Sequence, residues 1–190
     1  MKQAAYCLFE TPLGTCGLAW REPGTSRSTL AVACLQLPEA TPKATEARIA
    51  RKSGGHRAAA PPPAIAEAIR KIGRHLRGEL QDFRDVPLDL SEVTAFARQV
   101  YEAALRIPAG QTCTYGELAR AVGRPTEARA VGQALARNPI PIIIPCHRVL
   151  AANGRLGGFS AHGARLTKAK LLDIERAQFP GVLAFPPSNL

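Results

Sequence analysis

The segment from residue 139 to residue 149 constrains this chain most, because it joins a proline-bracketed apolar run to a cysteine and a histidine. Ile142, Ile143 and Ile144 are consecutive β-branched residues, a composition typical of a buried extended segment. Prolines stand on either side of the run, and proline continues neither a helix nor a central strand. We therefore expect Cys146 to lie where a stiff, buried segment ends.

A thiol at such a position has two interpretations. The thiolate is the reactive form of cysteine, and a neighbouring imidazole or positive charge lowers the thiol pKa from its free value of about 8.5. His147 and Arg148 follow Cys146 directly, which favours an activated nucleophile. The alternative is a buried structural cysteine beside an incidental histidine.

The charge of the chain indicates a polyanionic partner. Its 190 residues carry a formal net charge of +10, and the pI is about 10.0. A balance this basic favours nucleic acid first and an anionic membrane surface second. The hydrophobic fraction of 46% is enough for a real core, and the length fits one or two domains.

The cysteines indicate a reducing compartment. The chain has five of them, an odd number at wide spacing with no Cys-x-x-Cys pair, so neither a disulfide framework nor a zinc ribbon is indicated. We expect no metal and a cytoplasmic location. The sequence shows neither a secretory signal nor an apolar run long enough for a transmembrane span, so we expect no membrane partner.

The N-terminal half alternates short apolar runs with turns. Residues 5–37 predict an antiparallel meander of strands. Residues 38–63 are rich in Pro, Ala and basic residues and read as a surface connection with at most one or two helical turns around 45–51. From Ile65 to Leu80 apolar residues recur at helical spacing, which predicts a covering helix. We place a domain boundary near residue 90.

The C-terminal half begins with a predicted helix over residues 91–106 and continues with a two-helix unit. Thr114 and Glu117 match a capping box at the start of a short helix that Gly123 ends. Pro125 fits the first position of a second helix, expected to run over residues 126–137. Two short helices around a tight turn are typical of a helix-turn-helix, whose second helix reads DNA.

A glycine-rich loop and one last helix complete the chain. Residues 153–160 contain closely spaced glycines that permit a backbone to approach a ligand, without the spacing of a phosphate loop. The last helix is expected over residues 164–176. The pattern leaves two positions open for Glu175, on the surface or turned inward to orient His147.

Together these motifs resemble the methylated-DNA–protein-cysteine methyltransferases, also called O6-alkylguanine-DNA alkyltransferases. The most specific block is Asn138-Pro139-x-Pro141-x-x-x-Pro145-Cys146-His147-Arg148-Val149. The other similar segments are Thr114–Ala119, Ala128–Gly132, Gly157–Ser160 and Lys170–Glu175. The resemblance is strong from Phe96 to Glu175.

The resemblance implies a single-turnover repair reaction on double-stranded DNA. An O6-alkylguanine, or an O4-alkylthymine, is flipped out of the duplex and its alkyl group passes irreversibly to Cys146. His147 is implied as the base acting through water and Glu175 as its orienting acid, while Tyr115 donates to the guanine ring and Asn138 holds the turn. The implied DNA and substrate contacts are Ala128, Arg129, Arg137, Pro141, Val149, Phe159 and Ser160.

The resemblance also implies an α/β (α+β) fold with two domains. Residues 1–90 form a ribonuclease-H-like domain, with an antiparallel sheet, a covering helix and the connection at 38–63. Residues 91–190 form the helical DNA-binding and alkyl-acceptor domain, with a winged-helix-like helix-turn-helix. The implied protein is a monomer without cofactor, because the protein itself accepts the alkyl group. Two rivals are a damage sensor that binds alkylated DNA without catalysis, and a cysteine hydrolase using Cys146 and His147.

Overall fold

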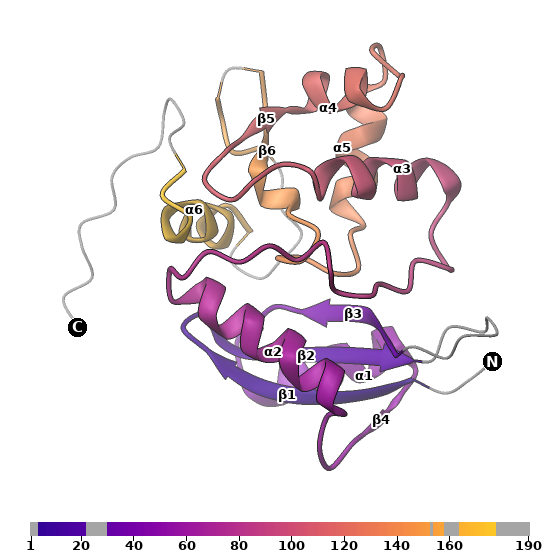
Figure 1. Cartoon of the computed structure of the whole chain (residues 1–190), viewed down its shortest axis with the longest axis vertical. Helices are drawn as coiled ribbons and strands as arrows, with labels where there is room; N and C mark the ends of the chain where they lie inside the picture. The colour runs from indigo at the N-terminus through magenta and orange to yellow at the C-terminus, as the bar shows by residue number, and fades with distance from the viewer. Residues whose placement is uncertain (1–3, 22–29, 153, 158–163, 178–190) are drawn as a thin grey trace.

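The computed structural model describes residues 4–21, 30–152, 154–157 and 164–177. A small sheet with two helices forms one part, and four further helices lie together beside it (Figure 1). This mixed architecture agrees with the predicted fold class. The search for a helix long and apolar enough to cross a membrane finds none within the described ranges.

The sheet begins with an antiparallel meander, as predicted. Strands β1 (Ala5–Thr11), β2 (Gly14–Arg21) and β3 (Ala31–Gln36) pair in succession, and the sheet order is β3-β2-β1-β4. The Thr11 hydroxyl donates to the Gly14 carbonyl at 2.7 Å, which closes the first turn. Gly14 has φ 113°, a conformation that favours glycine. The edge strand β4 (His56–Arg57) pairs parallel to β1, so the sheet is not wholly antiparallel.

The expected surface connection at 38–63 is wrong in one respect, because it contains a full helix. Helix α1 (Pro42–Ser53) has Thr41 as its N-cap, whose side chain accepts from the Ala44 N–H. Ile49 on this helix is fully buried. It packs against β2 at Gly17, where a Cβ would lie only 2.9 Å from the Ile49 side chain. The sequence pattern did not predict this helix because few of its residues are apolar. Its charged side chains lie on its exposed face.

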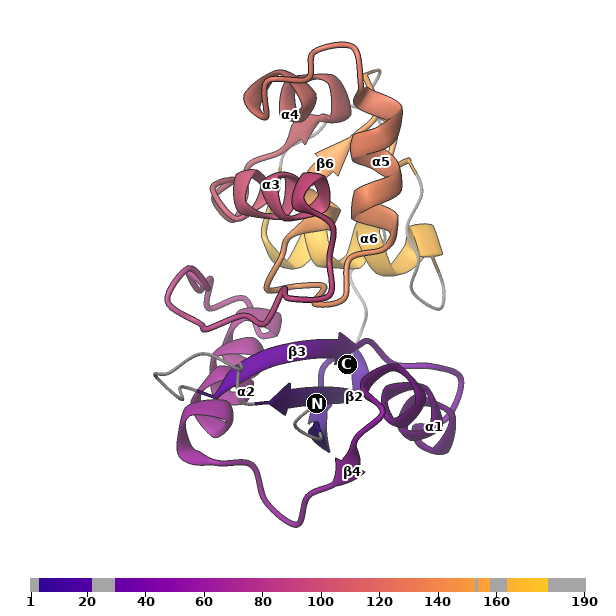
Figure 2. The same cartoon turned by 90° about the vertical axis from the view of Figure 1, so that its right-hand side faces the viewer.

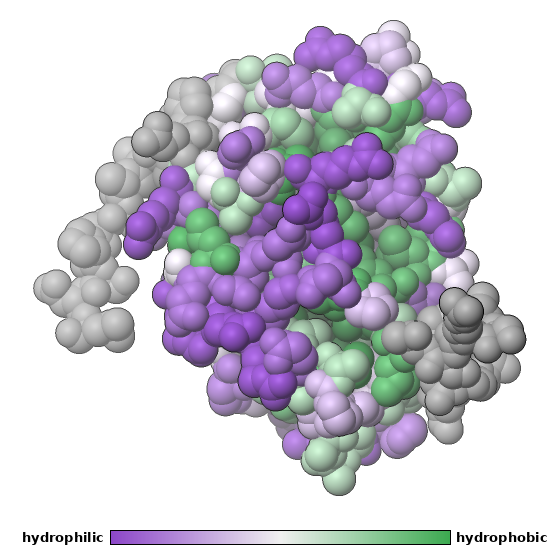
Figure 3. All heavy atoms as spheres, viewed as in Figure 1, coloured by the Kyte–Doolittle hydropathy of each residue, from purple (hydrophilic) through white to green (hydrophobic). Residues whose placement is uncertain are grey.

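Helices α1 and α2 (Pro63–Leu76) cover opposite faces of the sheet (Figure 2). Strand residues alternate between the two faces, so Tyr6, Ala19 and Cys34 pack with Ile49 of α1. The apolar stripe of α2 packs in the larger core on the other face. Hydrophilic side chains gather over the solvent-facing side of α2 (Figure 3).

The second part contains α3 (Ala95–Ala104), α4 (Tyr115–Ala121), α5 (Ala128–Ala136) and α6 (Ala164–Ile174). Strands β5 (Cys113–Thr114) and β6 (Val149–Leu150) pair in parallel beside α4. The predicted capping box is present, since the Thr114 side chain accepts from the Glu117 N–H and the Glu117 carboxylate accepts from the Thr114 N–H. The structure thus contains the short helix predicted between the capping box and Gly123, and α5 follows it as the second helix of the pair.

The second helix of this pair begins later than predicted. Residues 124–127 form a turn, in which the Glu127 N–H donates to the Arg124 carbonyl at 2.9 Å, and α5 starts at Ala128. Pro125 therefore lies in the turn and not at the first helical position. Arg124 lacks the short oxygen-bearing side chain of a good N-cap, which explains why the helix does not begin beside it.

The two parts meet along β3. The Leu35 N–H donates to the Pro139 carbonyl at 2.9 Å, and the Val32 N–H donates to the Pro87 carbonyl at 2.8 Å. The free edge of the sheet is therefore occupied by segments of the chain that lead into the second part. This contact fixes the start of the segment that carries Cys146.

Candidate active site

The isoleucine run is buried, but it is a tight turn and not the extended segment predicted. Ile142 has φ 71°, a left-handed conformation that is strained for a β-branched residue. The Asn138 amide Nδ2 donates to the Ile144 carbonyl, and its Oδ1 accepts from the Ile140 N–H, both at 2.9 Å. Asn138 thus supplies the backbone partners that a neighbouring strand would supply, so the chain can turn while fully buried.

Cys146 begins a short 3-10 helix, η1 (Cys146–Arg148), directly after this turn. Its side chain is buried, and burial raises the pKa of the thiol, while a hydrogen bond from Asn138 and the charge of Lys168 act in the opposite direction. The resting thiol is therefore protonated at neutral pH. A base is needed to convert it into a nucleophile.

His147, the residue after Cys146, is the candidate for that base. Its Nε2 lies 2.9 Å from Glu175 Oε1, and both side chains are fully buried. A carboxylate accepts, so Nε2 carries the hydrogen and Nδ1 is the basic nitrogen. Nδ1 is buried without a hydrogen-bond partner among the described residues. Burial lowers the pKa of His147 although Glu175 opposes this, which keeps the imidazole neutral and able to accept a proton.

Glu175 lies inside the protein, so the inward of its two predicted positions is the one observed. Arg148 donates from Nε to Oε2 at 2.9 Å and from Nη2 to Oε1 at 2.8 Å. Burial alone would raise the pKa of Glu175, but hydrogen bonds from His147, His75 and Arg148 hold it far below its usual range. The Glu175 carboxylate is therefore negatively charged at neutral pH, and it lies between two imidazoles and a guanidinium.

Lys168 lies on α6 and is fully buried near the thiol. Its Nζ donates to the Val149 carbonyl at 2.6 Å and lies 5.8 Å from the centre of the Tyr115 ring. Burial lowers the pKa of Lys168 to about 8, and the charge of the Cys146 thiolate acts against this shift. An ammonium group here stabilises a thiolate at Cys146.

Tyr115, the first residue of α4, contacts the glycine-rich loop. A Cβ built on Gly157 would lie 3.0 Å from the Tyr115 hydroxyl oxygen and 3.2 Å from its Cε2. Gly157 also has φ 67°. Because glycine has no side chain, this position leaves room for the Tyr115 hydroxyl.

We expect Gly157→Ala to slow the alkyl transfer that the resemblance implies by about tenfold, because the new methyl group displaces the Tyr115 hydroxyl. The measurement is the single-turnover rate on a duplex with one O6-methylguanine. Gly54→Ala is the matched control, since Gly54 has φ 61° and nothing within 4 Å of a built Cβ. It imposes similar backbone strain without touching Tyr115. Equal rates in the two variants would contradict a role for the Tyr115 hydroxyl.

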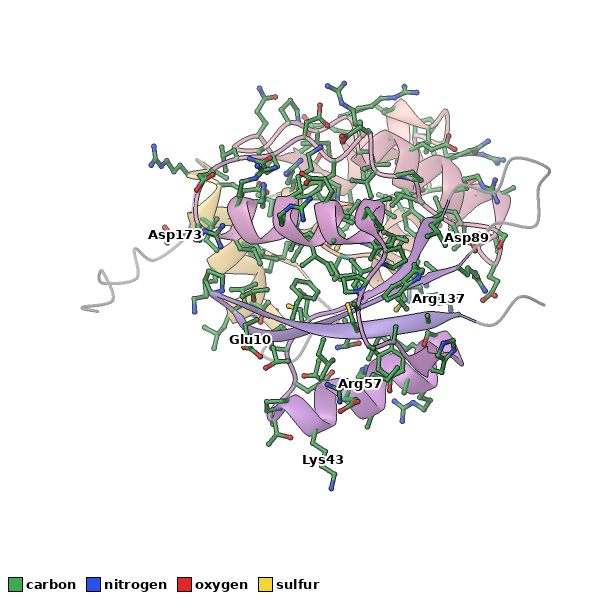
Figure 4. All side chains as sticks on the ribbon, turned by 60° about the horizontal axis from the view of Figure 1, so that its bottom comes forward. Glu10, Lys43, Arg57, Asp89, Arg137 and Asp173 are labelled. Atoms are coloured by element: carbon green, nitrogen blue, oxygen red, sulfur yellow. The ribbon has the colours of Figure 1, made fainter. Side chains whose placement is uncertain are left out.

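The structure separates the predicted DNA contacts. Ala128 and exposed Arg129 lie at the N-terminal end of α5, whereas Arg137 is its C-cap, about 12 Å further along the axis. Arg137 and Asp89 lie on one side of the molecule (Figure 4) and line a cavity of about 360 Å³ together with Arg21. Arg137 is thus not brought together with Arg129. Phe159 and Ser160 lie outside the described residues.

Pro141 and Val149 lie at the two ends of the segment that carries the thiol. Pro141 forms a bridge with Ile144 inside the turn, and Val149 begins β6 directly after η1. Val149 is buried, and its carbonyl is the group that accepts from Lys168. Both residues are therefore held by the same turn and strand that fix Cys146.

Sequence reasoning missed two buried polar residues of this site, His75 and Lys168, and it placed Arg148 beside the thiol without its pairing to Glu175. A signal existed for both of the missed residues. Lys168 and Glu175 are seven residues apart and share a helical face with Leu171 and Leu172. His75 follows the apolar stripe of α2 at helical spacing, and a polar residue on a buried face requires a partner.

The described residues contain no group of three or more His, Cys, Asp or Glu side chains that could hold a metal ion. Cys7, Cys16 and Cys34 are separate buried thiols in the sheet. Burial raises the pKa of each, so they behave as small core residues.

Comparison with known proteins agrees with this geometry. Residues 95–177 match the family model described as 6-O-methylguanine DNA methyltransferase, DNA binding domain. The methylated-DNA–protein-cysteine methyltransferase of Mycobacterium leprae is 47% identical over 115 residues, which cover 60% of this chain and 67% of the relative. The chain belongs to the methylated-DNA–protein-cysteine methyltransferase family.

Other members support this assignment over more of the chain. The constitutive methyltransferase of Bacillus subtilis is 41% identical over 117 residues, 62% of this chain and 69% of that protein. The crystal structure of Mycobacterium tuberculosis OGT in complex with DNA matches with a TM-score of 0.70 and 34% identity, covering 90% of this chain and 92% of that one. The methyltransferase of Pyrococcus kodakaraensis matches with a TM-score of 0.65 and 28% identity, covering 91% and 99%. The methyltransferase fold therefore includes the sheet as well as the helices.

Proposed function

We propose that this methyltransferase repairs DNA by moving the alkyl group from the O6 atom of guanine, or O4 of thymine, to Sγ of its own Cys146. Each molecule reacts once, because the thioether formed has no route back to the thiol. The observation that carries the proposal is the buried thiol beside a neutral imidazole whose Nε2 is held by a carboxylate at 2.9 Å. This is the nucleophile, base and orienting acid of covalent catalysis.

The reaction begins with proton transfer. The S–H bond of Cys146 breaks, and the proton passes through a water molecule to Nδ1 of His147. Glu175 stabilises the imidazolium that forms, as an orienting carboxylate does in a triad. The thiolate is generated only in the reacting complex, since burial raises the thiol pKa in the resting protein.

Alkyl transfer follows as a displacement at carbon. A sulfur lone pair forms the S–C bond while the C–O6 bond breaks, and the electron pair of that bond moves into the guanine ring. The Tyr115 hydroxyl donates toward the ring as this charge develops. The proton taken from the thiol replaces the alkyl group on the base, so guanine leaves neutral and no cofactor is consumed.

Access to O6 requires the base to leave the duplex, because the target carbon cannot be reached within the stack. The helix pair α4 and α5 presents Ala128 and Arg129 at its exposed end, and Arg129 fills the space left by the flipped nucleotide. The net charge of +10 supports binding to the phosphate backbone. Arg137 is a further phosphate contact at the other end of α5.

Backbone groups bind the flipped base, and apolar side chains line the space around its alkyl group. The Val149 carbonyl and the Ser160 N–H contact the base, while Pro141 and Phe159 line the space for the alkyl group. Lys168 supports the Val149 carbonyl through its 2.6 Å hydrogen bond. One protein molecule, acting as a monomer in the cytoplasm, is sufficient for this reaction.

Mass spectrometry tests the proposal directly. The protein is incubated with a duplex that contains one O6-methylguanine, and a duplex with guanine at that position is the control. We expect a gain of one methyl group per chain with the first duplex only, and peptide mapping should place it on Cys146 and on none of the other four cysteines. Tight binding to the lesion without a mass change would favour the damage sensor. Repeated turnover of a small ester would favour the hydrolase.

A further inference from the structure

A second histidine contacts the carboxylate of the proposed site. His75 lies near the end of α2 and is fully buried. Its Nε2 lies 2.9 Å from Glu175 Oε1, across 100 residues of sequence. His75 belongs to the sheet-bearing part of the protein, whereas Cys146, His147 and Glu175 all belong to the other part.

The hydrogen bonds of His75 fix its protonation state. The backbone N–H of Gln81 donates to His75 Nδ1 at 3.1 Å, so Nδ1 has a lone pair and carries no hydrogen. The hydrogen of the neutral ring is therefore on Nε2, where it points at Glu175. The edge-on contact with Phe83, at 5.2 Å between ring centres, holds the imidazole in this orientation.

Glu175 Oε1 thus accepts from three donors, His147 Nε2, His75 Nε2 and Arg148 Nη2. His147 must keep Nε2 on this oxygen in order to leave Nδ1 able to accept a proton. If His75 were absent, the carboxylate would lose the donor that approaches from α2, and it could turn toward Arg148. A shift of the carboxylate away from His147 would release the imidazole.

We propose that His75 is a positioning residue for alkyl transfer, which holds Glu175 in the orientation that keeps His147 ready to accept the thiol proton. This inference rests on the proposed function. It gives the sheet-bearing part a role in the chemistry, through one hydrogen bond from α2 to the carboxylate. His75 touches neither the base nor the thiol.

The same contact affects the pKa of His147. The groups that face Glu175 are His75 from α2 and His147 with Arg148 from η1. The hydrogen bond and charge of Glu175 raise the pKa of His147, so a carboxylate that turns away stabilises the imidazolium less strongly. Loss of the His75 contact is therefore expected to lower the pKa of His147 and to move the acid limb of the rate profile to lower pH.

Two amide variants separate positioning from structural support. The Gln side chain in His75→Gln is long enough to place an N–H where Nε2 stands, so it retains the donor to Glu175. The shorter side chain in His75→Asn can still accept from the Gln81 N–H, but it cannot reach Glu175. Both replace a buried ring with a smaller amide, and we expect both to lose stability to a similar extent. His56→Gln, at an exposed position on β4, is the control for loss of a histidine.

The readout is the single-turnover rate of methyl transfer as a function of pH, with thermal midpoints measured alongside. We expect His75→Asn to be about tenfold slower than wild type, as when a residue that orients a functional group loses its hydrogen bond, with its acid limb shifted to lower pH. His75→Gln should stay within about threefold of wild type with an unshifted limb. Equal slowing in both variants, or no slowing in His75→Asn, would overturn the proposal.

A measurement on the wild-type protein is independent of activity and of the stability of the variants. Nitrogen-15 NMR of the histidine rings should show His75 as the neutral Nε2–H tautomer, and the Nδ1–H tautomer would overturn the inference. Failure of the proposed function would appear differently, because wild-type protein would then transfer no methyl group at any pH.

Discussion

Cys146→Ala is expected to lose methyl transfer completely while it keeps its fold and its affinity for DNA. The variant removes the only atom proposed to form the new bond. Of the remaining cysteines, three lie in the sheet, and Cys113 lies on β5, paired with Val149. The loss of one buried sulfur costs little in packing. The proposed DNA contacts, on α5 and its flanks, are unchanged.

The measurement combines intact mass with fluorescence anisotropy on a duplex that contains O6-methylguanine. Cys113→Ala is the matched control, because Cys113 is a half-buried thiol whose pKa is raised to about 11 by burial. We expect Cys113→Ala to accept one methyl group at the wild-type rate. If Cys146→Ala still gained a methyl group, the acceptor would be another residue. If it lost DNA affinity instead, the thiol would serve binding and not transfer.

Local chemistry explains which elements could be predicted from sequence. The capping box of α4 involves Thr114 and Glu117, which are three residues apart, and both of its hydrogen bonds are present. The apolar stripe of α2 likewise depends only on spacing along one helix. In each case the residues that determine the structure are close together in the chain.

The predictions from sequence are wrong where an unusual side-chain contact, or a residue distant in the chain, determines the backbone conformation. Ile142 adopts a left-handed conformation because the Asn138 side chain satisfies the turn and the surrounding core encloses it. Helix α1 forms over a basic segment because Ile49 packs against the bare backbone at Gly17. Neither fact can be inferred from β-branching or from composition alone.

The site shows the same limit. The Cys-His-Arg block indicates the thiol and its neighbour. The position of Glu175, however, is determined by the packing of α6 beside η1, which no local pattern predicts. His75 is separated from Glu175 by 100 residues, so no local pattern connects them. The sequence therefore indicates which chemistry is present more readily than which partners hold it in place.

Glu175→Gln is expected to destabilise the protein by about 3–5 kcal/mol, the usual cost when a buried ion pair loses one partner. The side chains of Glu175 and Arg148 are 0% and 6% exposed. An amide nitrogen in place of a carboxylate oxygen would face a donor of Arg148, and the guanidinium would keep its charge without an anion. Urea unfolding at pH 7 measures the difference, and the methyl-transfer rate should fall as well.

Glu67→Gln is the matched control, because Glu67 also accepts from arginines, Arg70 and Arg74, but on the solvent-facing side of α2. Its side chain is 50% exposed, so water screens these pairs and we expect a much smaller loss than for Glu175→Gln. Similar losses in the two variants would contradict a buried anion at Glu175.

The pH dependence gives an independent check on the charge of Glu175. The folded-state pKa is held below its unfolded value of about 4.3, so the folded protein binds fewer protons than the unfolded chain at low pH. The stabilisation by Glu175 is therefore complete above about pH 5 and is lost as the pH falls toward the folded-state pKa. Below about pH 4 the stability advantage of wild type over Glu175→Gln should shrink by roughly 1.4 kcal/mol per pH unit. An advantage that stayed constant between pH 7 and pH 3 would mean that the pKa of Glu175 is the same in the folded and unfolded protein, and the hydrogen bonds from Arg148 would then need another explanation.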